Sequence, residues 1–405
     1  MAQLKGMGYL KRKLSAKTAR VDLRYTHYEM KHIAKDMKIA TPPQLMHWTE
    51  VLGWCAKAVD CLADRLVFRE FRNDNFGFNE IFQMNNPDVL VDSAVTSAMI
   101  ASCCFTYISP DAEGYPRLQI LDGRNATGEL DPITGLLTEG YAVLKRSSET
   151  DQPLMEAYFE PYRTTYYSEG KVYMVYTHKV PYPLLVPIIF RPDEKRPFGH
   201  SRISRACMSI VDAALRTVKR SEISAEFYSF PQRWATGLAQ EHEDMDKWKA
   251  VMSAMMTFEK DESGDHPVLG QFAQGSMQPH VEQFKMFASQ FAGETGLTLD
   301  DLGFPTENPS SSEAIKAAHE NLRLTARKAQ RNFGTGFLNV GMLAACLRDD
   351  YAYRREAFYE TRAIWEPVFE PDAGMLGAIG DAVFKINQAL PGYFDEEKMK
   401  DMTGF

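Results

Sequence analysis

The chain has 405 residues, enough for two or three domains, with 44% hydrophobic and 25% charged residues as in an ordinary globular protein. No apolar run reaches the roughly 18 to 20 residues that span a bilayer, and no apolar segment follows the basic N-terminus as it would in a cleaved signal peptide. A formal net charge of -8 argues against tight binding of nucleic acid through phosphate neutralisation, although not against contact without adhesion.

Helices are predicted in the first hundred residues and strands after them. Residues 1–40 are predicted to form polar helices and an arm, and a helix over about 44–66 follows a Thr-Pro-Pro break. Residues 87–105 are predicted to be a helix running into a strand. Between 105 and 180, β-rich runs alternate with turn signals such as the Asp-Pro-Ile-Thr-Gly run at 131–135, which predicts a small antiparallel sheet. The 44–66 helix has one apolar stripe at three- and four-residue steps: Val51, Trp54, Ala58, Cys61, Leu62 and Leu66.

The middle of the chain combines long helices with a small mixed segment. A proline-rich stretch, 181–197, precedes a long amphipathic helix predicted over about 202–228. The mixed segment, 229–277, has a predicted charged helix, an acidic loop at 259–265 and a short strand at 268–272.

Glycines and a capping motif define the predicted helices of the last third. Gly293 is the expected C-cap of one helix, and Ser310 with Glu313 has the spacing of a capping box at the start of the next. Gly334 and Gly336 inside that longest helix predict a kink. In order, the predicted elements are a helix over about 279–292, the longest helix over about 311–347, a strand-like stretch over 361–370 and a helix over about 375–390.

Motifs of catalysis are missing from the sequence. It contains no GxxxxGK[ST] phosphate loop, no HExxH zinc motif and no GxSxG nucleophile elbow, and no two cysteines have CxxC spacing. The sequence therefore predicts no catalytic residue, no metal site and no cofactor, and we interpret the chain as not an enzyme. Six cysteines are interpreted as buried, reduced thiols: Cys55, Cys61, Cys103, Cys104, Cys207 and Cys346.

Three polar groups have two interpretations each. Asp300 and Asp301 could serve a metal or act as a general base, but they fit a loop or cap more simply. His27 and His32 are five residues apart, off a common helical face, and are interpreted as surface residues rather than metal ligands. Basic residues of the longest helix could face DNA, or be solvated or ion-paired between neighbouring copies: Lys316, Arg323, Arg327, Lys328 and Arg331.

Four blocks, taken together and in order, resemble one known family. They are the Gly53–Leu66 run with Phe71 and Arg72, the 131–135 turn, the Val186–Ser204 run containing Pro-Phe-Gly-His at 197–200, and the Thr295–Gly303 run before Asn308–Ile315. In this order, over about residues 44–370, they resemble the portal proteins of long-tailed bacteriophages. His200 departs from the basic or other polar residue expected there, so the resemblance assigns it no role.

The resemblance implies an α+β fold, the portal fold, with a wing, a helical stem, a small α/β clip, a long kinked wing helix and a short C-terminal crown. The implied parts are the N-terminal wing at 1–195, a stem helix at 196–228, the clip at 229–277, a second stem helix at 278–295, a tunnel loop at 296–312, the long kinked helix and a wing strand at 313–370, and the crown at 371–405.

The resemblance also implies a function. Portal proteins form a cyclic ring of usually about twelve subunits at one capsid vertex, joined by two different complementary faces. The implied partners are copies of itself, double-stranded DNA contacted weakly and without sequence preference, the terminase large subunit, the major capsid and scaffolding proteins, and a head–tail connector. The implied location is the virion, after assembly in the bacterial cytoplasm, with no membrane role. The implied site residues are Thr306, Glu307, Asn308, Ser310 and Ser311 in the tunnel loop, and Glu259, Asp261, Glu262 and Asp265 in the acidic loop of the clip.

Two other functions are considered. Another head–tail connector or minor capsid assembly protein would share the virion setting, but a clip flanked by two stem helices favours the portal. A metal-dependent nuclease or hydrolase would use Asp300, Asp301 and a histidine, and would be supported by finding these carboxylates around a metal.

Overall fold

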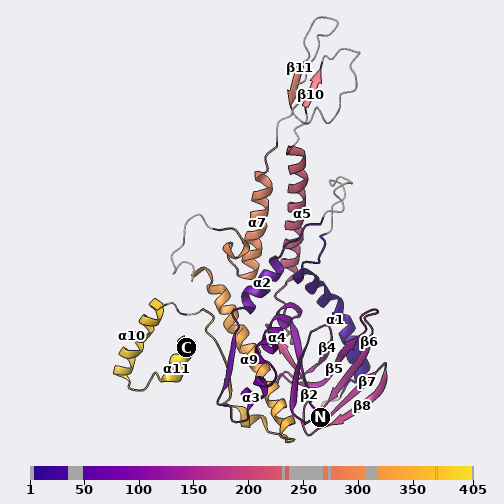
Figure 1. The fold of residues 1–405 in the computed structure, drawn as a ribbon, viewed down its shortest axis with the longest axis vertical. Helices are drawn as coiled ribbons and strands as arrows, with labels where there is room; N and C mark the ends of the chain where they lie inside the picture. Colours follow the sequence, from indigo (N-terminus) through magenta and orange to yellow (C-terminus); the bar gives the residue numbers. More distant parts are fainter. Residues whose placement is uncertain are drawn as a thin grey trace. The chain divides into compact units, whose positions relative to one another are not determined.

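The computed structural model describes residues 4–34, 49–229, 233–236, 268–271, 275–305, 317–369, 371 and 373–403 (Figure 1). The chain divides into two compact units. Unit 1 comprises Met1–His32, Gly53–Met208 and Ala292–Phe405, and unit 2 comprises Ile33–Leu52 and Ser209–Phe291. Both boundaries near 208 and 291 fall inside helices, α5 (Arg205–Ser229) and α7 (Gln278–Thr295).

The largest sheet of unit 1 is antiparallel and confirms the sheet predicted between 105 and 180. Its strand order is β4-β5-β6-β7-β8, so each strand pairs with its neighbour in sequence. The 131–135 turn joins the first two strands, with Thr134 Oγ1 donating to Asp131 Oδ2 at 2.6 Å and Gly135 at a φ of 71°. The strands are β4 (Ala126–Leu130), β5 (Leu137–Arg146), β6 (Pro153–Glu160), β7 (Arg163–Ser168) and β8 (Lys171–Thr177).

A second, three-stranded sheet contains a strand that the sequence did not predict. Strand β2 (Cys103–Pro110) pairs with β3 (Pro116–Leu121) on one side and with β9 (Leu185–Ile189) on the other. The proline-rich stretch hid β9. Pro187 is compatible with it because β9 is an edge strand, where one missing backbone N–H need not break the ladder.

Helices α4 (Pro87–Ala101) and α9 (Glu320–Arg348) contact this second sheet. Helix α9 also contacts β12 (Arg362–Trp365), which pairs antiparallel with β1 (Phe68–Arg72) in a separate two-stranded sheet. Aromatic rings fill the space between them and α3 (Phe78–Gln83), with Phe71 and Phe78 edge to face at 5.5 Å. The predicted run from helix to strand at 87–105 and the predicted strand near 361–370 are thereby confirmed.

The glycines of α9 are sites of close packing. A Cβ on Gly336 would lie 2.7 Å from Ile188 Cδ1, and one on Gly341 would lie 2.6 Å from the Phe78 ring. Helix α9 is continuous over all of these glycines. The kink expected near 334–336 stays a prediction, and the capping box at Ser310 and Glu313 lies outside the described residues.

Two helix ends differ from their predictions. Residues 49–53 are not helical, so α2 is Trp54–Ala63 and Val51 is exposed, whereas the other members of its predicted stripe are buried. Gly293 lies inside α7. The helix ends at Thr295 and is followed by Gly296, whose φ of 70° suits glycine and whose N–H donates to Ala292 O at 2.8 Å.

The two ends of unit 1 are helical. The predicted N-terminal helix is α1 (Met7–Tyr28), and the predicted C-terminal helix is α10 (Ala373–Ala389). A further helix, α11 (Glu396–Thr403), was not predicted. Single turns of 3-10 helix occur at Asp300–Leu302 and Arg355–Phe358. The mixture of packed helices and antiparallel sheets confirms the α+β class.

Unit 2 contains the remainder of α5 and α7 and one strand pair. Strand β10 (Arg233–Thr236) pairs antiparallel with β11 (Val268–Gln271), which confirms the predicted strand at 268–272. The predicted charged helix and the acidic loop 259–265 lie outside the described residues.

Candidate functional site

The first candidate surface is the helix pair of unit 2, where α5 and α7 run side by side (Figure 1). Thr217 Oγ1 donates to Gln283 Oε1 at 3.2 Å, and Ser224 Oγ lies 3.2 Å from His280 Nε2. On α7, Val281 is 55% exposed and Met286 is 46% exposed. Polar side chains therefore contribute to the contact between the two helices, and α7 exposes two large apolar side chains.

The second candidate surface is the edge strand β8 of the five-stranded sheet. Four consecutive apolar side chains on it are exposed, Tyr173 most of all at 69%, so neither face of this strand is fully covered. No strand among the described residues pairs with its outer edge. Edge strands of this kind commonly pair with another chain unless they are protected. The exposed residues are Val172, Tyr173, Met174 and Val175.

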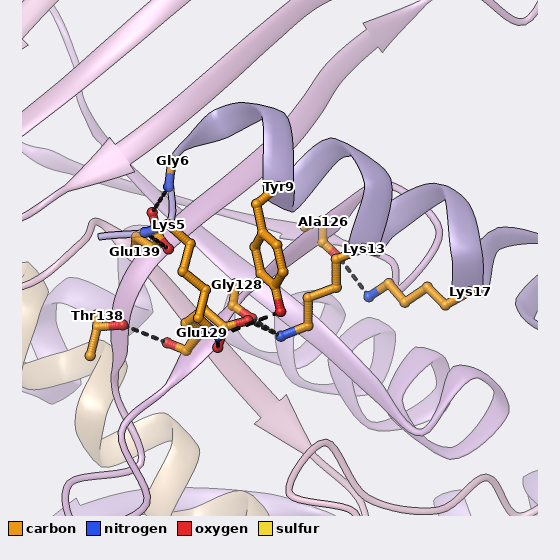
Figure 2. A network of polar contacts seen from close by, with 10 residues as sticks. All are labelled: Lys5, Gly6, Tyr9, Lys13, Lys17, Ala126, Gly128, Glu129, Thr138 and Glu139. Carbon is orange, nitrogen blue, oxygen red and sulfur yellow. Dashed lines mark hydrogen bonds and ion pairs between the residues drawn. The ribbon is translucent and has the colours of Figure 1, made fainter. Parts of the chain in front are cut away.

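The opposite edge of that sheet, β4, is covered by α1 (Figure 2). Lys13 Nζ donates to Gly128 O at 2.7 Å and Lys17 Nζ donates to Ala126 O at 2.8 Å. These carbonyls point away from β5, because alternate residues of an edge strand turn their backbone groups outward. The basic N-terminus is therefore a cover for a strand edge.

Buried carboxylates hold α1 on the sheet. Glu139 is only 1% exposed and accepts hydrogen bonds from the backbone N–H groups of Lys5 at 2.9 Å and Gly6 at 3.0 Å (Figure 2). Tyr158 Oη donates to the same carboxylate at 2.8 Å. A carboxylate at the first turn of a helix satisfies free N–H groups and interacts favourably with the helix dipole.

Two more glutamates bind lysines of α1 and of the residues just before it. Lys5 and Lys13 lie 2.8 and 2.5 Å from the carboxylate of Glu129. Burial alone would raise the pKa of Glu129, but the hydrogen bonds and charges of both lysines together lower it. Lys11 lies 2.7 Å from Glu156, which also accepts a hydrogen bond from the Tyr141 hydroxyl. Both glutamates therefore have a cationic partner.

A buried arginine ties together the segments that meet at the start of α5. Arg202 Nε donates to Ala58 O at 3.1 Å, and Arg202 Nη2 donates to Thr295 O at 2.6 Å. Its backbone N–H donates to Met99 O at 2.8 Å. Burial lowers the pKa of the guanidinium to about 10, so it stays charged at neutral pH. No role was predicted for Arg202, because nothing in the sequence shows that it is buried.

His200 has a local structural role. Its Nε2 lies 2.5 Å from Asp193 Oδ2, and Arg196 Nη1 lies 3.4 Å from its Nδ1. The neighbouring Gly199 has a φ of 76°, and a Cβ there would lie 2.1 Å from Phe190 O. The Pro-Phe-Gly-His run is therefore a tight turn that requires its glycine.

The two adjacent aspartates serve a turn. Thr298 donates to Asp301 Oδ2 from both its backbone N–H and its hydroxyl, each at 2.9 Å. His319 Nδ1 lies 3.8 Å from the same oxygen, and Asp300 is exposed at the start of the 3-10 turn. The hydrogen bonds from Thr298 match the simpler interpretation of Asp301 as a residue that caps a turn.

Other sequence-predicted residues fall into three groups. All six cysteines are buried and free, as predicted. His27 is buried, and its ring stacks on His32 at 3.8 Å between centroids, so the surface interpretation of His27 was wrong. The tunnel-loop and clip-loop residues lie outside the described residues: Thr306, Glu307, Asn308, Ser310 and Ser311, and Glu259, Asp261, Glu262 and Asp265.

These features define an α+β protein, and comparison of its sequence with known families shows to which family it belongs. The family described as "Phage portal protein, SPP1 Gp6-like" matches residues 17–360. Because this match covers most of the chain, the chain belongs to the phage portal protein family. The resemblance described by the four sequence blocks is thereby confirmed.

Two portal proteins of mycobacteriophages are similar to the chain. That of Mycobacterium phage D29 is 24% identical over 403 residues, covering 94% of this chain and 81% of that protein. That of Mycobacterium phage L5 is 23% identical over 332 residues, covering 76% and 67%. Among solved structures, a chain in the "Neck of empty GTA particle computed with C6 symmetry" is 12% identical, with a TM-score of 0.48 over 87% of this chain and 90% of that chain.

Proposed function

We propose that the chain forms a cyclic ring of about twelve copies at one capsid vertex, through which double-stranded DNA is packaged and ejected. Membership of the portal family over residues 17–360 carries this proposal. The role is structural rather than catalytic, and the force for packaging comes from a separate motor. Its location is the virion, after assembly in the bacterial cytoplasm. No helix among the described residues is long and apolar enough to cross a membrane.

The surfaces described above support assembly from identical copies. The outward apolar side chains of the unit 2 helix pair and the open edge of β8 are surfaces that a neighbouring copy can cover. A cyclic ring needs two different faces on each subunit. One edge of the five-stranded sheet is closed by α1 and the other is open, so the sheet has the required asymmetry.

Parts of the chain are assigned within this proposal. The α5–α7 pair is the stem, and segment 229–277, which includes β10 and β11, is the clip. The clip docks the terminase large subunit and later the head–tail connector, with the acidic loop 259–265 as the contact. Wing and crown are formed by the elements of unit 1, facing the capsid and scaffolding proteins. Segment 296–312 is the tunnel loop at the narrowest point of the channel.

The test is electron microscopy and light scattering of the purified chain. A ring with a central hole, and a mass several times the 46.0 kDa of one chain, is the expected result. A chain that stays monomeric at every salt concentration and at high protein concentration would contradict the proposal. Deleting residues 259–265 should leave the ring intact and reduce packaging; normal packaging by this variant would remove the loop from the motor contact.

A further inference from the structure

A recess of about 710 Å³ lies between α9 and β12 in unit 1. The residues from α9 recur at three- and four-residue steps, so they form one face of the helix. All four consecutive residues of β12 also line the recess. Because neighbouring residues of a strand point to opposite faces, this lining means that the recess runs along the edge of β12. The α9 residues are Leu324, Arg327, Lys328, Gln330, Arg331, Gly334, Thr335 and Leu338.

The edge of β12 that borders the recess is open. Strand β12 pairs with β1 through its other edge, from Phe68 opposite Trp365 to Arg72 opposite Arg362. In the described part of the chain, no second strand pairs with β12. Its backbone groups on the recess side are therefore available to an added strand, as in peptide recognition by strand addition. Elsewhere the chain covers such edges, as Lys13 and Lys17 do for β4.

Four cations surround the recess in a chain whose formal net charge is -8. Three of these cations are exposed on α9: Arg327, Lys328 and Arg331. No carboxylate of the described residues lies within ion-pair distance of any of the three. Arg362 stands across the recess, where its guanidinium donates to Thr361 O at 3.0 Å and to Tyr359 O. By contrast, the neighbouring Arg323 is already paired with Glu320 at 2.7 Å.

Apolar side chains complete the lining. Leu324 and Leu338 contribute from α9, and Ile364 and Trp365 from β12. Trp365 is fixed in place by edge-to-face contact with Phe68 at 5.5 Å between centroids. A strand of four residues is about 13 Å long, so the recess has room for one short extended segment.

We propose that this recess binds an extended acidic peptide segment of a partner protein, which adds as a strand to β12 and places its carboxylates on Arg327, Lys328, Arg331 and Arg362. A peptide satisfies all three properties of the recess, because its backbone pairs with the strand edge, its carboxylates meet the cations and its apolar side chains cover Trp365. Duplex DNA would use only the cations, since its phosphates cannot extend a β-ladder.

The test uses the full chain and a fluorescent peptide of four alternating Glu-Val pairs. The peptide should bind with an affinity that falls as salt is added. A second peptide of the same sequence, methylated on alternate backbone nitrogens, keeps the charge but cannot pair with a strand, so it should bind at least about tenfold more weakly. The double variant Lys328→Glu and Arg331→Glu, at exposed helix positions, should also lose at least about tenfold in affinity.

The matched control is the double variant Lys57→Glu and Lys145→Glu, which changes the net charge equally at exposed positions outside the recess and outside the open edge of β8. It should bind like the unmodified chain. Equal binding of the methylated peptide, or displacement of the peptide by a 20-base-pair duplex at equal phosphate and carboxylate concentration, would overturn the proposal. Loss of self-association in the recess variant alone would also overturn it, because the recess would then be a contact between copies of this chain.

Discussion

Glu139 shows at the residue scale how a buried charge can be structural. Its carboxylate accepts two backbone hydrogen bonds from the start of α1 and one from Tyr158. We expect Glu139→Ala to lower the free energy of unfolding by about 1–3 kcal/mol, since buried donors would lose their acceptor. Urea unfolding measures this loss. In Glu139→Gln, which keeps the shape, the loss should be smaller; equal stability of all three proteins would contradict the assigned role.

The buried side chain of His178 makes the stability of the folded chain depend on pH, in a direction that follows from its lowered pKa. Burial lowers its pKa from 6.5 to about 4, more than offsetting the opposite effect of the Val180 backbone. Below pH 6.5 the unfolded chain binds the proton better than the folded chain, so stability is full above pH 6.5 and is lost as pH falls toward 4. The loss is at most about 3 kcal/mol.

This pH dependence is checked by measuring the free energy of unfolding of the unmodified chain and of His178→Gln at a series of pH values. The unmodified chain should lose more stability than His178→Gln between pH 6.5 and 4, because other acid-sensitive groups are common to both. Parallel pH profiles for the two proteins would show that His178 is not held neutral by the fold.

Residue-scale predictions from sequence were successful where residue type alone decides the environment. The cysteines are buried because a small apolar side chain between apolar neighbours has no other favourable place. The roles of Lys13, Lys17 and Arg202 were not predicted, because their acceptors are backbone carbonyls about a hundred residues away in sequence, and carbonyls leave no signal in a sequence.

At the element scale, two helical glycines differ in whether their surroundings leave room for a Cβ atom. Gly341 in α9 packs on Phe78, which is fully buried and cannot yield, whereas a Cβ on Gly8 in α1 would meet nothing within 4 Å. We expect Gly341→Ala to destabilise the chain by about 1–3 kcal/mol through overpacking. Gly8→Ala should stabilise it by up to about 1 kcal/mol through helix propensity. Thermal unfolding of both variants checks the pair, and a stabilised Gly341→Ala would show that α9 can move away from Phe78.

Element boundaries were predictable only where local chemistry decides them. The turn at 131–135 carries its own hydrogen-bonding side chains, so its position followed from the sequence. The end of α7 could not be predicted in this way, because Gly293 and Gly296 are both plausible caps. Only the structure shows that Gly296 takes the positive φ and donates to Ala292 O. Strand β9 was missed because its proline argues against a strand until its place at a sheet edge is known.

At the scale of the whole molecule, order along the chain was the informative signal. No single block identified the family, but the succession of helix, turn, Pro-Phe-Gly-His run and loop did, and the family match covers the same region. The candidate surfaces, by contrast, could not be predicted from the order of motifs along the chain. The open edge of β8 and the recess beside β12 result from which strands pair, and strand pairing involves residues distant in sequence.

The charge of the proposed channel is a property of the whole ring. In the proposed ring, about twelve copies at -8 would make a strongly negative assembly, and a channel lining of the same sign would let DNA pass without adhering. In the proposed tunnel loop, Glu307 contributes one negative charge per subunit close to the DNA. Replacing Glu307 with Lys turns this ring of charge positive, so DNA should adhere and packaging should slow.

Packaging rates measured with Glu307→Lys at increasing salt concentration test this expectation. Added salt should restore much of the rate, because it screens the new attraction between lysine and phosphate. Glu149→Lys is the matched control: it makes the same change of charge at an exposed turn between β5 and β6, where packaging should stay normal. Equal slowing by both variants would mean that net charge matters and the position of Glu307 does not. A rate unchanged by Glu307→Lys would place residue 307 away from the path of the DNA.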